Sequence, residues 1–245
     1  MIPKVIHYCW FGGKPLPKDA ERCISSWNKF MPDYQIKQWD ESNFDIDSIP
    51  YTREAYNAKK YAFVSDYARF WIMYHYGGIY FDTDVEVVKP IEDIIANGNF
   101  MGAEQQDDNN ITVNPGLGFG MKKNSSIIYD LMKIYQNSRF ICEDGTVKVK
   151  NIVEITTNYL KENGLVNTNK TQQCCGCTIY PKDYFCPIDY DTKELKITRN
   201  TRTIHHYAES WVPLSTKIKN NIGRVCGKKI IQLLIKVKKI IKLGK

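Results

Sequence analysis

The sequence predicts an alternating α/β domain with a mostly parallel central sheet. Residues 2–39 follow the order strand, helix, strand, which is how a parallel sheet begins. A later helical stretch ends at Gly77-Gly78 and leads directly into an apolar strand. The chain has 245 residues, of which 43% are hydrophobic and 25% are charged. This balance is typical of one globular domain that buries its own core.

The first three elements follow from local residue patterns. Residues 2–11 form an apolar run rich in β-branched and aromatic side chains, and a Gly-Gly pair closes it, so we predict a buried strand. A helix is expected over residues 18–30. The second strand is expected over residues 34–39 and ends at Asp40, which places a carboxylate at its C-terminal end.

The middle and later parts of the chain continue the alternation. Residues 51–76 have a helical pattern with a break near Lys59-Lys60, and Gly77-Gly78 is a helix C-terminal signal. Residues 79–88 form an apolar run that predicts one continuous strand. Further strands are expected over residues 100–104, 116–121 and 178–185, and further helices over residues 125–138 and 152–163.

Charge divides the chain into two predicted parts. The net charge is +7, yet residues 217–245 hold ten basic residues and no acidic one, which leaves −3 for residues 1–216. We therefore predict a folded domain over residues 1–216 and a basic tail over 217–245. A nucleic-acid reader carries its positive stripe on the folded face, so nucleic acid is not an expected partner.

The end of the tail predicts an amphipathic helix. On a helical wheel of about 100° per residue, one side of residues 228–245 is apolar and the other is rich in lysine. Such a helix binds the surface of an anionic membrane. The alternative is a C-terminal helix that packs on its own domain.

Location and cysteine chemistry are predicted from what the sequence lacks. The N-terminus has no signal-peptide pattern, and no stretch reaches the roughly 18 apolar residues of a membrane span. We therefore expect a cytoplasmic protein, which the basic tail would hold on the inner face of the cell membrane. The eight cysteines are then expected to be reduced thiols. Cys174 and Cys177 leave zinc as an alternative, without a convincing second pair.

A pair of carboxylates at the end of the third predicted strand indicates metal chemistry. Asp82 and Asp84 are two residues apart, so on a continuous strand their side chains point to the same side. Two such carboxylates repel each other unless a cation lies beside them. Oxygen ligands suit Mn²⁺ or Mg²⁺. The alternative is a solvated strand end without an ion. On the preceding helix, Asp66 and Arg69 are three residues apart and share a face.

The family resemblance rests on four segments in a fixed order. They are residues 2–10 (IPKVIHYCW), 62–69 (AFVSDYAR), 77–84 (GGIYFDTD), and Ile204-His-His206 followed by Ser210-Trp211. This set, which spans residues 2–213, resembles glycosyltransferase family 32, the DXD family of bacterial capsule enzymes and fungal α-mannosyltransferases. It is more distantly similar to the large clostridial glucosylating toxins.

The resemblance implies a GT-A type, Rossmann-like fold, a nucleotide-sugar donor, a divalent metal ion and retention of anomeric configuration. Asp82 and Asp84 would contact ribose, sugar and metal, with Asp84 the firmer metal ligand. Asp66 would accept hydrogen bonds from sugar hydroxyls. Arg69 would reach the sugar or the diphosphate, so these four residues form the expected catalytic group.

Further donor contacts are also implied by the resemblance. Trp10 would line the nucleotide-base site at the end of the first strand, where α/β sheets bind ligands. His206 would be an additional metal or diphosphate contact, although His205 and His206 point to opposite sides if the chain is extended. Ser210 and Trp211 would close over the leaving group.

The expected activity is transfer of a hexose or N-acetylhexosamine from a nucleotide sugar to a saccharide. A UDP-sugar is the favoured donor, and GDP-mannose stays open. The acceptor is expected to be lipid-linked, in capsular or surface polysaccharide synthesis. Two alternatives remain. One is a haloacid dehalogenase-like phosphatase that uses the Asp-x-Asp pair, and the other is a non-catalytic nucleotide-sugar or polysaccharide-binding module.

Overall fold

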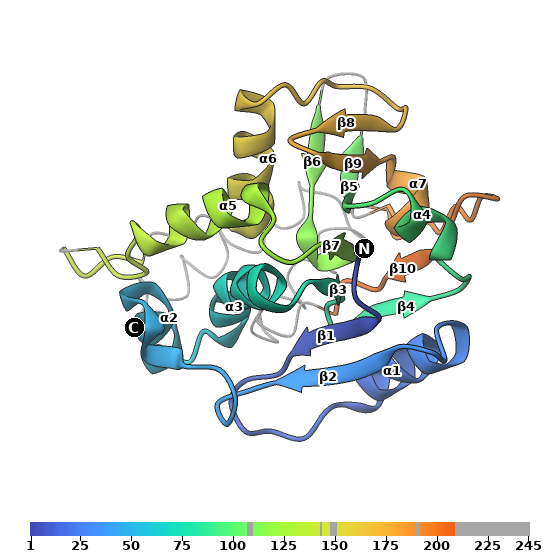
Figure 1. Ribbon diagram of the computed structural model, residues 1–245. Coiled ribbons are helices and arrows are strands. Elements are labelled where there is room, and N and C mark those ends of the chain that lie inside the picture. The colour runs from blue at the N-terminus through green and yellow to red at the C-terminus, as the bar shows by residue number, and fades with distance from the viewer. Residues whose placement is uncertain (107–109, 143, 148–150, 190–191, 209–245) are drawn as a thin grey trace, which may run out of the picture. The chain divides into compact units, whose positions relative to one another are not determined.

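The computed structural model describes residues 1–106, 110–142, 144–147, 151–189 and 192–208 (Figure 1). Residues 1–188 and 195–206 form one compact unit, to which every helix and strand named below belongs. Residues 189–194 and 207–245 are assigned to a second unit. The predicted boundary at residues 216 and 217 and the amphipathic tail lie outside the described residues. No described helix is long and apolar enough to cross a membrane.

An eight-stranded sheet forms the centre of the first unit. Its order is β2-β1-β3-β7-β5-β9-β8, and β6 pairs with β5. β1 pairs in parallel with β2 and β3, and β5 pairs in parallel with β9, whereas the remaining pairs are antiparallel. The strands are β1 (Val5–Cys9), β2 (Gln35–Trp39), β3 (Gly78–Tyr80), β5 (Phe100–Gln106), β6 (Ile111–Val113), β7 (Phe119–Met121), β8 (Gln172–Cys174) and β9 (Cys177–Tyr180).

These pairings confirm the predicted α/β class. β1, β2, β3, β5 and β9 run in one direction, and β6, β7 and β8 run in the other. Parallel strands are therefore the majority. The helices that connect or cover the strands are α1 (Lys18–Phe30), α2 (Pro50–Asn57), α3 (Tyr61–Tyr76), α4 (Glu92–Ala96), α5 (Ser126–Gln136), α6 (Ile152–Glu162) and α7 (Lys182–Phe185), with short 3₁₀ turns η1 (Ile46–Ser48) and η2 (Pro115–Leu117).

Helices α1 and α3 cover opposite faces of the sheet. Tyr8 of β1 packs on Trp27 of α1, with ring centroids 5.7 Å apart. The preceding residue, His7, lies 6.3 Å from the ring of Tyr76 at the end of α3. Successive side chains of a strand point to opposite faces, so the two helices sit on either side of β1. α5 packs on α3, where Phe70 and Tyr135 lie 6.1 Å apart.

Local signals predicted the helices well. α1 has the expected bounds, and the chain breaks between α2 and α3 at residues 58–60 as predicted. α3 ends at Gly77, whose φ of 65° is in the left-handed region, and its N–H donates to Met73. A side chain at this position would meet the backbone of Lys123 and Met121. A glycine therefore ends the helix for conformational and for steric reasons.

The expected continuous strand over residues 79–88 is wrong. β3 ends at Tyr80, a turn follows, and β4 (Val85–Val87) pairs with β10 (Thr203–His205) in a separate two-stranded sheet. The Val85 N–H donates to the Asp82 carbonyl at 3.1 Å and closes the turn. Asp and Thr favour such turns because their side chains compete for backbone hydrogen bonds. The two aspartates consequently lie in a turn and not on one face of a strand.

Two later strands are also shorter than predicted. Residues 116–121 begin as part of η2, and only Phe119–Met121 forms a strand. The strand predicted over 178–185 ends at Tyr180, because Pro181 precedes the short helix α7. Proline cannot donate a ladder hydrogen bond, so it ends the strand there.

Candidate active site

A buried ion-pair network joins helix α3 to the turn after β3. The Arg69 Nη2 lies 3.1 Å from Asp66 Oδ1, and its Nη1 lies 3.2 Å from Asp82 Oδ2. Only 5% of the Arg69 side chain and 10% of the Asp66 side chain are exposed. One guanidinium thus holds two carboxylates in place, and the sequence prediction that Asp66 and Arg69 share a face is confirmed.

The Asp82 carboxylate is fixed from two sides. The Tyr80 hydroxyl donates to Oδ1 at 3.2 Å, and Arg69 donates to Oδ2. The guanidinium also lies 4.9 Å from the centre of the Tyr80 ring. Because 31% of the Asp82 side chain remains exposed, the carboxylate is oriented by the protein and still open to a ligand.

A glycine-containing loop packs directly against this carboxylate. The Gly116 carbonyl accepts from the Asp82 N–H at 3.1 Å, and a side chain at Gly116 would collide with the Asp82 carboxylate. Asn114 shapes the loop, since its Oδ1 accepts from the Gly116 N–H at 2.7 Å and its Nδ2 donates to Glu104 at 2.8 Å. Residue 116 is therefore a glycine because the carboxylate needs the space.

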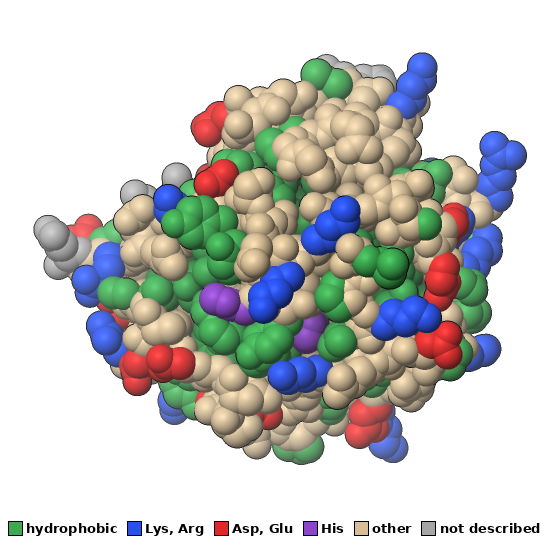
Figure 2. Space-filling model, viewed as in Figure 1, with side chains coloured by type: hydrophobic (Ala, Val, Ile, Leu, Met, Phe, Trp, Pro, Cys, Tyr) green, Lys and Arg blue, Asp and Glu red, His purple; other side chains and the backbone are tan. Residues whose placement is uncertain are grey.

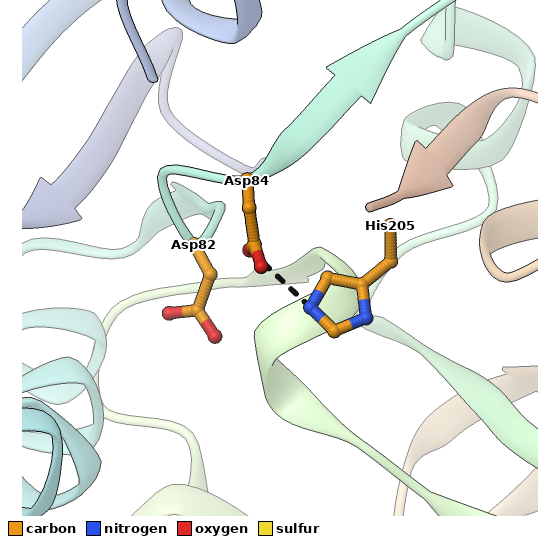
Figure 3. A group of neighbouring side chains, drawn as sticks. All are labelled: Asp82, Asp84 and His205. Carbon is orange, nitrogen blue, oxygen red and sulfur yellow. Dashed lines mark ion pairs between the residues drawn. The ribbon is translucent and has the colours of Figure 1, made fainter. Parts of the chain in front are cut away.

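Asp84 contacts a histidine that lies far from it in the sequence. His205 Nε2 lies 3.3 Å from Asp84 Oδ1 (Figure 3). The ligand atoms of Asp82, Asp84 and His205 all lie within 4.8 Å of one another. Strand β10 brings His205 here because it pairs with β4, immediately after the turn that holds the two aspartates.

The structure places His206, the predicted additional metal or diphosphate contact, beside an acidic side chain. His206 Nε2 lies 2.8 Å from Glu86 Oε2, outside the group of three. Its neighbour faces Asp84 because side chains alternate along the extended backbone of β10. The alternation was expected, but which of the two histidines faces the site depends on the register with β4.

The remaining predicted donor contacts have different outcomes. Trp10 follows β1 at the carboxyl edge of the parallel strands, where it is partly buried and its Nε1 donates to the Lys14 carbonyl at 2.6 Å. This position agrees with a place beside the nucleotide base, and that role stays a prediction. Ser210 and Trp211 lie outside the described residues.

Burial and neighbouring charges shift the pKa values of the residues in this site. Burial raises the pKa of Asp66 to about 7, against the opposing effect of Arg69. Burial also disfavours the charge of Arg69, but Asp82, Tyr80 and Asp66 together raise its pKa above the usual value. Although burial favours a neutral imidazole, Asp84 raises the pKa of His205 well above its usual value. Without a cation, a protonated His205 balances Asp84.

The three-residue group fits a divalent cation. Two carboxylates and one imidazole are ligands for first-row divalent metals, with the oxygen atoms favouring Mn²⁺ or Mg²⁺. Within the part of the chain that the structure describes, this is the one such group, and the cysteines considered for zinc are not in it. Because His205 must lose its proton before it can bind a cation, cation binding is coupled to proton release.

Comparison with known proteins identifies the class of the site. Residues 17–101 match the family described as the glycosyltransferase sugar-binding region containing a DXD motif. The matched range includes Asp66, Arg69, Asp82 and Asp84, so these site residues lie in the segment that is similar to this sugar-binding region. The resemblance predicted from the sequence is thereby confirmed.

Curated relatives extend the similarity. The chain is 28% identical over 111 residues to inositol phosphoceramide mannosyltransferase 1 of Schizosaccharomyces pombe, covering 41% of this chain and 33% of that protein. It is 32% identical over 113 residues to the uncharacterized glycosyltransferase L373 of Acanthamoeba polyphaga mimivirus, covering 42% and 43%. The chain therefore spans less than half the length of these relatives.

A solved structure supports the fold. The PaToxG glycosyltransferase superposes with a TM-score of 0.50 at 20% identity, covering 66% of this chain and 69% of that chain. The predicted GT-A type fold is confirmed. Sequence reasoning missed His205, Tyr80 and Gly116 as parts of the site. Tyr80 could have been found, because it lies only two residues before Asp82 in the chain.

Proposed function

We propose that this chain is a metal-dependent, retaining glycosyltransferase that moves a hexose or N-acetylhexosamine from a nucleotide sugar to a saccharide acceptor. The observation that carries the proposal is the Asp82–Asp84–His205 group beside the buried Asp66–Arg69 pair. The sugar-binding match over residues 17–101 supports the class of substrate.

The site residues divide the work of binding between them. Asp84, Asp82 and His205 would hold the cation, whose charge stabilises a departing diphosphate. The exposed part of Asp82 would accept hydrogen bonds from the donor. Arg69 is 4% exposed, so it would orient Asp66 and Asp82 instead of reaching the sugar or the diphosphate itself, as the resemblance implied. Trp10 would line the base site, and Ser210 and Trp211 would close over the leaving group.

The proposed transfer takes place on one face of the donor sugar. The bond from the anomeric carbon to the diphosphate breaks as the acceptor oxygen bonds to that carbon. The departing diphosphate takes the proton of the acceptor hydroxyl. The protein contributes position and charge balance, which are the main sources of catalysis for such a reaction.

The donor and acceptor are narrower proposals. A UDP-sugar is favoured, and a mannose donor such as GDP-mannose belongs in the same screen because several relatives are named as mannosyltransferases. Those names also give a lipid, inositol phosphoceramide, as their acceptor, which supports a lipid-linked acceptor here. A role in capsular or surface polysaccharide synthesis, at the inner face of the cell membrane, completes the proposal.

Calorimetric titration with UDP and with GDP, each with Mn²⁺, with Mg²⁺ and with EDTA, tests this function. We expect one nucleotide to bind only when the metal is present, and the matching nucleotide sugars to be hydrolysed slowly. Asp84→Asn should abolish both effects with little loss of stability, because Asp84 lies in a partly exposed turn. Absence of nucleotide binding under every metal condition would overturn the proposal.

A further inference from the structure

A cluster of amphipathic aromatic side chains lies at the C-terminal end of α3. Trp71 packs against Tyr76 with ring centroids 6.1 Å apart, and Tyr74 packs against Tyr129 of α5 at 5.6 Å. Tyr76 is 45% exposed and Tyr129 is 42% exposed. We call these four residues the aromatic face.

Lysines surround the aromatic face. Lys37 of β2 lies 4.8 Å from the ring centre of Tyr76, and Lys133 lies 4.4 Å from that of Tyr129. Lys123 borders the same end of α3: its backbone lies against Gly77, and the next residue donates to the Tyr74 carbonyl at 2.8 Å. We call these three residues the lysine rim.

The three lysines outnumber the acidic side chain that lies beside them. Asp130 follows Tyr129 in the chain, and its carboxylate accepts from the Tyr159 hydroxyl of α6 at 2.7 Å and keeps its negative charge. Figure 2 shows the same arrangement of charge: over the region where Figure 1 places α3 and β1, hydrophobic and histidine side chains surround basic ones, and acidic ones lie nearer the edge. The aromatic face is therefore set in a positive environment.

We infer that the aromatic face and the lysine rim together form a docking surface for an anionic lipid bilayer. Tyrosine and tryptophan prefer the headgroup level of a membrane because each has an apolar ring and a polar tip. Lysines near that level are attracted by acidic headgroups. The surface belongs to the folded unit and adds to the proposed function a membrane contact that is separate from residues 217–245.

Charge argues against the two other occupants of this surface. A second copy docked through the same face would bring two lysine rims together. The C-terminal tail of this chain carries ten basic residues and no acidic one over residues 217–245, so it would also meet like charge. An anionic bilayer is the occupant whose charge complements the surface.

Cosedimentation of the full chain with vesicles tests the inference. The vesicles are phosphatidylcholine alone or phosphatidylcholine mixed with phosphatidylglycerol, at low and high salt. We expect the unchanged chain to bind the anionic vesicles. In the double variant Lys123→Gln/Lys133→Gln this binding should weaken roughly fivefold for each lysine lost. The variant Tyr76→Ser/Tyr129→Ser should weaken binding at both salt concentrations, because its effect is not electrostatic.

A matched control removes the same charge elsewhere. Lys18→Gln/Lys29→Gln changes two exposed lysines of α1, the helix that covers the opposite face of the sheet. It should bind vesicles as the unchanged chain does. Equal binding by all three variants, or no binding of the unchanged chain to anionic vesicles, would overturn the inference. Self-association of the chain that is lost in Tyr76→Ser/Tyr129→Ser would also overturn it, in favour of a second copy.

Nucleotide binding by the same preparations separates this inference from the proposed function. The aromatic face and the lysine rim share no residue with the candidate site, so the variants should bind nucleotide and metal unchanged. A chain that binds vesicles but no nucleotide would refute the proposed function and leave the docking surface standing. A chain that binds nucleotide but no anionic vesicles would refute the docking surface and leave the proposed function standing.

Discussion

The buried positive charge of Arg69 is tolerated because the side chains around it compensate for it. An isolated guanidinium in the core is costly, but two carboxylates and an aromatic ring surround this one. Removing either carboxylate would leave the buried guanidinium with less compensating charge. At the scale of single residues, the site is therefore a unit whose members depend on one another.

The two adjacent histidines give a direct residue-scale prediction. His205→Asn should weaken Mn²⁺ binding about tenfold to a hundredfold, the range found even for residues that only orient metal ligands. His206→Asn should change it little, because that side chain pairs with Glu86. Calorimetric titration of both variants with Mn²⁺ checks this. Equal effects of the two substitutions would remove His205 from the metal group.

A buried histidine makes stability depend on pH. His7 Nδ1 accepts from Trp39 Nε1 at 3.0 Å, and its Nε2 lies 3.0 Å from the Gly77 carbonyl, so the ring is neutral with its proton on Nε2. Burial lowers the pKa of His7 from 6.5 to about 4. The unfolded chain therefore takes up a proton near pH 6.5, and the folded chain does so only near pH 4.

The free energy of unfolding should fall as the pH falls from 6.5 toward 4. The contribution of His7 is fully present above pH 6.5, and about 2 kcal/mol of it should be lost between pH 7 and pH 5. Urea unfolding at both pH values, compared with His7→Gln, isolates this share, since the other groups titrate alike in both proteins. An equal loss in the variant would contradict the neutral buried state of His7.

At the scale of elements, helix α1 supports the turn that carries the two aspartates. Trp27 Nε1 donates to the Val85 carbonyl at 2.7 Å, and Ser26 Oγ accepts from the Val87 N–H at 2.9 Å. The Trp27 ring also packs 5.4 Å from that of Phe81. Helix α1 thus contacts Phe81, just after β3, and strand β4, so it supports the segment that carries the two aspartates at both ends.

Trp27→Phe should destabilise the protein because it leaves the Val85 carbonyl buried without its donor. The expected loss is about 1–3 kcal/mol in the free energy of unfolding, and metal binding should weaken because the turn loses a support. Thermal and urea unfolding, with a Mn²⁺ titration, measure the two effects. Phe30→Leu, at the partly exposed end of the same helix, is the control and should leave metal binding intact.

At the scale of the whole molecule, the proposed function predicts separable roles for the first unit and the tail. The first unit contains the sheet and the complete group of three ligands. The tail carries the basic excess of the chain. A chain truncated after Pro213 should keep metal-dependent nucleotide binding and donor hydrolysis, and should lose part of its affinity for anionic vesicles.

The loss on truncation should be largest at low salt, where charges are least screened. The vesicle binding that remains should then be the share of the aromatic face and the lysine rim. Circular dichroism of the truncated chain is the control. If the truncated chain is unfolded, the tail packs on the domain as part of its core, which was the alternative interpretation of its sequence.

The sequence by itself determined the features that depend on neighbours in the chain. The apolar pattern and the Gly-Gly pair defined α3 and its end, and helical spacing placed Asp66 beside Arg69. The ordered motifs were enough to identify the sugar-binding region. These signals act over a few residues, so they can be read without the fold.

Only the tertiary structure decided how distant segments meet. The Asp82 N–H meets the Gly116 carbonyl across the fold, and His205 rather than His206 joins the group because β10 pairs with β4 in one register. Asp82 and Gly116 come together only once the sheet has formed. The physical reason is that a register shift of one residue reverses every side chain of a strand, and nothing local in residues 203–205 encodes that register.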